Sequence, residues 1–139
     1  SYLFNRVLAA RVARGCWDRL LPGELAVFAD SNSGFVVADP AEEGDRLGAG
    51  ELHPSGPLPG TEGLAPADRA AALEAAGLEE EAELVSGLRQ QEVRTHRRAL
   101  RALPQETAWE PVPAGIRIAF RLPAGSFATA VVREVIRAG

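Results

Sequence analysis

The chain has 139 residues, about the length of one folded domain with a single hydrophobic core. Apolar residues make up 46% and charged residues 24%, as in an ordinary soluble globular protein, and the formal net charge is −4. This acidic balance excludes a chain that attracts nucleic acid over its whole surface, so any such surface must come from local basic clusters.

Cysteine usage and hydropathy exclude further classes of protein. Cys16 is the single cysteine, which rules out an internal disulfide framework and a thiolate metal cluster. No apolar run approaches the roughly 18 residues of a membrane span, and the start does not resemble a signal peptide. Glycine-rich phosphate loops, G-x-S-x-G and H-E-x-x-H are all absent. We therefore expect a cytoplasmic protein without a metal site and without a membrane segment.

Residues 2–14 are predicted to form a helix that ends at Gly15. Its apolar side chains recur on one side, at Leu3, Phe4, Val7, Leu8 and Val12. Arg11 falls near the middle of this stripe, and we expect its charged end to extend from the last turn into solvent. The alternative is a buried ion pair or a phosphate contact.

The next segments predict a hairpin, a short helix and a loop. LAVFAD and GFVVAD are short apolar runs separated by SNS, which favours two antiparallel strands. Residues 42–47 could form one short helix. The stretch GAGELHPSGPLPGTEGLAP has five glycines and four prolines in 19 residues, so we predict a loop or linker outside the core.

From Pro66 the composition changes to strong helix formers. Pro66 suits a first helical turn, and Gly77 is expected to separate a helix over 66–76 from a second one that contains Leu84, Val85 and Leu88. Acidic side chains gather at the start of the second helix, where the backbone dipole favours negative charge. We interpret them as a solvated capping cluster: Glu79, Glu80, Glu81 and Glu83.

A cluster of arginines predicts a basic helix face over residues 93–103. The arginines follow the i, i+3, i+4, i+7 spacing of one face, and Pro104 ends the segment. The members of this face are Arg94, Arg97, Arg98 and Arg101. His96, Leu100 and Leu103 project toward the other side.

The last part of the chain predicts a strand and a helix. GIRIAFRLP alternates apolar and polar residues as a half-buried strand does. A helix is predicted at about 125–138, with Ser126 as N-cap, Gly139 beyond its end, and a buried stripe of Ala128, Val131, Val132, Val135 and Ile136.

Phe127 stands at the rim of that stripe, in the first turn of the predicted helix. The backbone N–H groups of 126–128 would be unpaired there, and they attract anions or a carbonyl oxygen. An aromatic face beside such donors suits a flat ligand with polar edges, such as a nucleobase. The alternative is a phenylalanine partly buried under a loop.

Two segments carry a resemblance to a known family. LPAGSFATAVVREV resembles the C-terminal motif of the tRNA pseudouridine synthase D (TruD) family, and SYLFNRVLAARV is similar to another segment of that family. The similarity is strong at 1–14 and 120–136, and the order of the segments between them also fits.

The resemblance implies an isomerase without a cofactor that converts uridine 13 of certain tRNAs into pseudouridine after flipping the nucleotide out of its stack. It assigns Phe127 to the substrate-contacting phenylalanine. Asn5 matches a recurrent position of the family, and we expect it to have a structural role that anchors the helix. The family's essential aspartate stands in a G-x-K-D segment that does not occur here. We therefore expect no catalytic residue in this chain, an aspartate upstream of it, and no turnover by this chain alone.

The resemblance also implies an α+β architecture. Residues 1–105 would form most of a mixed α/β TRUD insertion domain, and 106–139 the C-terminal part of an antiparallel pseudouridine synthase core. The expected partner is tRNA, bound by a monomer, with the basic face on its phosphates. The alternatives are an exposed face paired with glutamates such as Glu92, and a noncatalytic RNA-binding or interaction module that uses the arginines.

Overall fold

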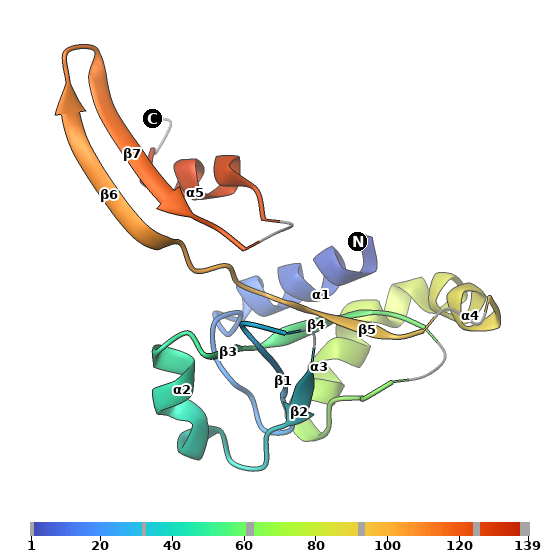
Figure 1. Ribbon diagram of the computed structural model, residues 1–139. Coiled ribbons are helices and arrows are strands. Elements are labelled where there is room, and N and C mark those ends of the chain that lie inside the picture. Colours follow the sequence, from blue (N-terminus) through green and yellow to red (C-terminus); the bar gives the residue numbers. More distant parts are fainter. Residues whose placement is uncertain (1, 32, 61–62, 92–93, 124–125, 137–139) are drawn as a thin grey trace. The chain divides into compact units, whose positions relative to one another are not determined.

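The computed structural model describes residues 2–31, 33–60, 63–91, 94–123 and 126–136 (Figure 1). The fold is α+β, as expected. The chain divides into two compact units, Ser1–Arg101 and Ala102–Gly139. The assignment of 1–105 to an insertion domain and of 106–139 to a catalytic core stays a prediction.

The first unit begins with α1, Tyr2–Ala13, which confirms the predicted helix. Leu3, Phe4 and Val7 are buried, but Val12 is exposed and Arg11 takes the next buried position. At 100° per residue, the position four residues after Val7 lies on the same face as Val7, and that position is Arg11. The expectation that Arg11 extends into solvent is therefore wrong.

A three-stranded antiparallel sheet follows, in the order β2-β1-β3. The strands are β1, Leu25–Phe28, β2, Gly34–Val36, and β3, Leu52–His53. β1 and β2 form the predicted hairpin, with Ala26 opposite Phe35. Between β2 and β3, a 3-10 turn at Pro40–Glu43 (η1) and helix α2, Gly44–Gly48, confirm the short helix.

The proline- and glycine-rich stretch was predicted as a loop outside the core, and this prediction is wrong. It contains β3 and also β4, Ser55–Leu58, and Leu52 belongs to a core cluster with Leu20, Ala26 and Val37. Pro57 is tolerated because β4 belongs to a two-stranded sheet, in which each strand has a free edge. A Cβ atom at Gly56 would lie 3.0 Å from the ring of Phe4, so the absent side chain lets α1 approach the strand.

Two helices come next, α3, Asp68–Leu78, and α4, Ala82–Gln90, separated by a 3-10 turn at Glu79–Glu81 (η2). Gly77 was expected to separate the two helices, and this prediction is wrong: Gly77 lies inside α3, which packs on α1. Glu80 and Glu81, which were interpreted as part of a solvated capping cluster, also contact side chains of α1. Glu80 Oε2 lies 3.1 Å from an Arg6 nitrogen, and the Tyr2 hydroxyl donates to Glu81 over 2.6 Å.

The predicted basic helix over 93–103 is wrong. The described part of this segment contains β5, His96–Ala99, which pairs antiparallel with β4 and sets Leu58 opposite His96 and Ser55 opposite Ala99. Successive residues of a strand face opposite sides, so Arg97 and Arg98 point in different directions. A single face formed by all four arginines therefore does not exist.

The second unit contains a hairpin and a helix. β6, Gln105–Val112, pairs antiparallel with β7, Gly115–Arg121, which confirms the predicted strand. Helix α5, Ala128–Val135, is shorter than predicted, and its N-cap is Phe127, not Ser126. Its apolar stripe was expected to be buried, but Val132, Val135 and Ile136 are exposed. The expected end at Gly139 lies outside the described residues.

Candidate functional site

Phe127 occupies the junction between the β7–α5 connection and helix α5. Its backbone is extended (φ −108°, ψ 122°), and its side chain is 78% exposed. The carbonyl of Phe127 accepts a hydrogen bond from Ala130 N at 3.1 Å. The ring therefore stands beside the first turn of the helix, open to a partner.

The backbone donors near this ring differ in part from the prediction. Ser126 N, expected to be unpaired, donates to Pro123 O over 3.2 Å. The N–H groups of Ala128 and Thr129 belong to the first turn, where an α-helix supplies no acceptor for them. Phe127 and the helix donors thus adjoin each other along the chain, with the donors at Ala128 and Thr129 where the sequence suggested 126–128.

The four predicted RNA-binding arginines fall into two pairs with different surroundings. Arg94 and Arg98 are exposed, whereas Arg97 and Arg101 are partly buried and bonded within the first unit. The carbon Cζ of Arg98 lies 5.2 Å from the centre of the Phe4 ring, at the distance of a cation–π contact.

Arg97 joins β5 to β4 and to helix α3. Its guanidinium donates to both carboxylate oxygens of Glu74, at 2.9 and 3.0 Å, and to the backbone and hydroxyl oxygens of Ser55. A bidentate pair with further hydrogen bonds uses most of the five guanidinium donors. Arg97 is therefore a structural link between three elements.

Arg101 is bound in the same internal manner. Its Nε donates to His53 Nδ1 over 2.9 Å, and one terminal nitrogen donates to the carbonyls of Leu47 and Leu52 at 2.6 and 3.2 Å. Burial, followed by the charge of Arg101, lowers the pKa of His53 from its ordinary value. His53 is thus held as a neutral acceptor.

Arg11 forms a buried ion pair that sequence analysis had given only as the alternative. Its terminal nitrogen lies 2.9 Å from Glu24 Oε2, and the two side chains are 3% and 1% exposed. The position of Arg11 in the centre of an apolar stripe indicated that it could be buried. Helical spacing could not identify its partner, because Glu24 is 13 residues away and outside the helix.

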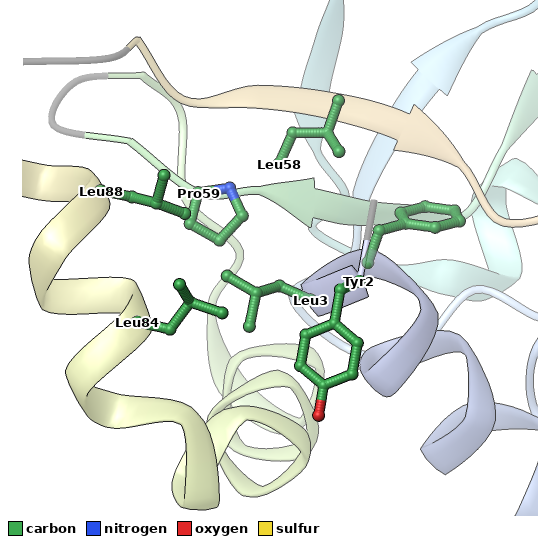
Figure 2. A pocket seen from close by; sticks show the side chains of 7 residues that line it. Tyr2, Leu3, Leu58, Pro59, Leu84 and Leu88 are labelled. Atoms are coloured by element: carbon green, nitrogen blue, oxygen red, sulfur yellow. The ribbon is translucent and has the colours of Figure 1, made fainter. Parts of the chain in front are cut away.

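A pocket that the sequence did not predict lies in the first unit, between α1, the end of β4 and α4 (Figure 2). Its volume is about 230 Å³, and its lining is apolar except for the hydroxyl of Tyr2: Tyr2, Leu3, Phe4, Leu58, Pro59, Leu84 and Leu88. The hydrogen bond from Tyr2 to Glu81 raises the pKa of the Tyr2 hydroxyl. The pocket offers few polar groups, so it has no evident catalytic chemistry.

Within the described ranges, no three or more His, Cys, Asp or Glu side chains gather in a way that could hold a metal ion. In the same part of the chain, every helix is too short or too polar to cross a membrane. The expectation that the protein works without a cofactor stays a prediction.

Comparison with solved structures identifies the class of fold. A tRNA pseudouridine synthase D from Methanosarcina mazei matches 96% of this chain, and 35% of its own chain, with a TM-score of 0.71. The sequence identity is 22%, so this likeness concerns the fold.

Comparison of sequences identifies the family. The family model described as tRNA pseudouridine synthase D (TruD) matches residues 1–135. Proteins of that name from Pseudomonas aeruginosa (strain PAO1) and Stutzerimonas stutzeri are 45% and 42% identical, each over 98% of this chain. The chain belongs to the TruD family, which confirms the resemblance.

The chain covers only part of these relatives, 39% of the Pseudomonas aeruginosa protein and 40% of the Stutzerimonas stutzeri protein. The match favours an enzyme family over the alternative of a noncatalytic interaction module.

Proposed function

We propose that the full-length protein carrying these residues is a tRNA pseudouridine synthase. The match of the family model to residues 1–135 is the observation that carries this proposal. In the reaction, the bond from the ribose to N1 of uracil breaks and a bond from the ribose to C5 forms. The proton of C5 is lost and N1 gains one, so the product is an isomer and no oxidant or reductant is needed.

The finer part of the proposal is that uridine 13 is the target and that the base is flipped out before it reacts. The catalytic aspartate would come from polypeptide outside these 139 residues, because no aspartate here stands in a G-x-K-D segment. The second unit would belong to the catalytic core, and most of the first unit to an inserted domain.

Phe127 is proposed to hold the flipped uracil by stacking. Stacking requires a ring whose face is accessible, and a ring that is 78% exposed meets this requirement. The adjoining N–H groups of the first turn of α5 can donate to a carbonyl oxygen of a base, which an apolar pocket alone could not do. The exposed ring and the adjoining donors together support a binding role.

Arg94 and Arg98 are proposed to contact tRNA phosphates. Both are exposed, and the guanidinium of Arg98 lies over the Phe4 ring, which restricts its position. Arg97 and Arg101, which were part of the expected basic surface, are less suited because their donors bind Glu74, Ser55, His53 and backbone carbonyls. We therefore restrict the proposed phosphate contacts to the exposed pair.

The test of Phe127 compares Phe127→Ala and Phe127→Tyr with the wild type in the full-length protein. Loss of stacking worth about 1–3 kcal/mol predicts a fall in kcat/KM of roughly 5- to 150-fold for Phe127→Ala on tRNA. Phe127→Tyr keeps an aromatic face and should retain most of the activity. The melting temperature should change little in both variants, because the ring is exposed.

A different pattern would contradict this role. If Phe127→Ala formed pseudouridine at the wild-type rate but melted at a markedly lower temperature, the ring would serve packing. Val131→Ala in the same helix is the matched control, because Val131 is half-buried and should affect folding more than the exposed Phe127 does.

A further inference from the structure

The end of the first unit is held in place by one compact set of hydrogen bonds. Leu100 N donates to Pro54 O over 2.9 Å, and the guanidinium of Arg101 binds His53 Nδ1 and the carbonyls of Leu47 and Leu52. Arg101 is the last residue of the first unit. Residues 102–104 form neither helix nor strand before β6 begins at Gln105.

The hydrogen bond between Arg101 and His53 determines the protonation state of the imidazole. A guanidinium has only donors and stays charged, so His53 Nδ1 must carry a lone pair and the ring must be neutral. A proton on Nδ1 would remove the acceptor and place two positive charges side by side. His53 is 8% exposed, so water has little access to relieve that repulsion.

We propose that His53 is a pH-sensitive positioning residue. At neutral pH it holds, through Arg101, the point where the chain leaves the first unit, and protonation of His53 releases that point. We call His53, Arg101 and the two carbonyls that Arg101 binds the exit clasp. The proposal concerns a conformational device within the first unit and does not depend on the proposed enzymatic activity.

The charges around the exit clasp favour its closed form. Arg101 faces His53, and Asp18, in the segment after α1, acts on Arg101 from a different element. The contacts from α2 and β3 are uncharged carbonyls, and the strand beside His53 presents Val27 opposite it. Asp18 thus stabilises the cation of the clasp, while no anion among these groups stabilises a protonated His53.

The direction of the pH effect follows from the lowered pKa of His53. The released form binds a proton with the ordinary pKa of about 6.5, and the clasped form binds it only at lower pH. Above 6.5 neither form is protonated, so the clasp has its full stability. As the pH falls from 6.5 toward the lowered pKa, the released form gains protons first and the clasp loses stability.

The experiment measures amide hydrogen exchange of Leu100, whose N–H donates to Pro54 O, in the full-length protein between pH 7.5 and 5.5, corrected for the intrinsic exchange rate. In the wild type, protection should fall by up to about tenfold for each pH unit below 6.5. The ¹⁵N shifts of His53 should show a neutral ring with the proton on Nε2 at pH 7.5. Neither measurement needs tRNA, so its outcome is separate from that of the enzymatic proposal.

Two variants and a matched control make the test specific. In His53→Asn, the side-chain oxygen can accept at the position of Nδ1 but cannot titrate, so protection should stay high across the pH range. In His53→Leu, protection should be low at every pH. His96→Asn removes the other histidine, which is exposed on β5 outside the clasp, and should keep the wild-type pH response.

The proposal is overturned if the wild type shows no pH response, if His53→Asn responds as the wild type does, or if Nδ1 carries a proton at pH 7.5. Should His53→Leu fail to fold, the ¹⁵N shifts of the wild type and the comparison of His53→Asn with His96→Asn still decide the question.

Discussion

Arg11 and Glu24 keep their charges inside the first unit because each finds several hydrogen-bond partners there. Arg11 donates to the carbonyls of Cys16 and Arg19 at 3.1 and 2.8 Å in addition to its pair with Glu24. Glu24 also accepts from the backbone N–H groups of Leu21 and Ser55, at 3.1 and 3.4 Å. These contacts connect α1, the start of β1 and β4, so the pair acts as a joint between three segments.

We predict that Glu24→Gln lowers the free energy of unfolding of the first unit by about 3–5 kcal/mol, because it leaves the Arg11 cation buried without its counter-charge. The matched control is Glu80→Gln, which breaks the pair with Arg6 at a carboxylate that is 81% exposed and should cost under about 1 kcal/mol. Denaturant unfolding followed by Trp17 fluorescence in a Trp109→Phe background measures both. Equal losses for the two variants would contradict the buried-pair account.

At the scale of elements, the turn at Pro22 and Gly23 fixes where α3 begins relative to β1. Ala67 N donates to Gly23 O at 2.9 Å, and Ala70 N donates to Pro22 O at 3.1 Å. Gly23 has a φ of +77°, and a Cβ atom there would lie 2.1 Å from the Ala67 carbonyl oxygen. The turn and the start of the helix therefore fit together only when this position has no side chain.

We predict that Gly23→Ala lowers the free energy of unfolding by more than about 2 kcal/mol, from backbone strain and from displacement of Ala67. Gly87→Ala is the control, because a Cβ atom at this position in α4 would meet open space. That substitution should raise stability by about 0.5–1 kcal/mol through better helix propensity. The same denaturant experiment checks both, and a neutral Gly23→Ala would refute the close contact.

At the scale of the whole molecule, net charge and local charge have different consequences. The chain carries a formal charge of −4, and several arginines are already paired with glutamates within the first unit. An attraction to tRNA in this part of the protein must therefore come from exposed arginines such as Arg94 and Arg98.

We predict that Arg94→Ala with Arg98→Ala in the full-length protein reduces the magnitude of the slope of log affinity for tRNA against log salt by about 1.5. The reason is that binding releases fewer counterions once two phosphate contacts are lost. Arg14→Ala with Arg69→Ala removes the same charge from two other exposed positions and should change the slope less. Binding titrations at several salt concentrations measure it. A wild-type slope in the first double variant would rule out the phosphate contacts.

Periodicity was enough to predict the elements whose signal is local. The 3.6-residue spacing in 2–14 and the alternation in GIRIAFRLP both correspond to the observed α1 and β7. The arginine cluster was misassigned because spacings of three and four residues also occur in a strand with its flanking turns. Pairing with β4, about 40 residues earlier in the chain, decided between helix and strand.

The candidate site was also predicted only in part from the sequence. Phe127 could be singled out from its position beside an apolar stripe, and the family could be suspected from the motif around it. The sequence could not show which arginines stay exposed, because Arg97 is bonded to Ser55, 42 residues away, and Arg101 to His53, 48 residues away. The sequence by itself determined the local elements and the kinship of the chain. Only the tertiary structure decided the burial of Arg11, the core position of the proline-rich segment and the choice of exposed arginines, because each depends on partners that folding brings together from distant parts of the chain.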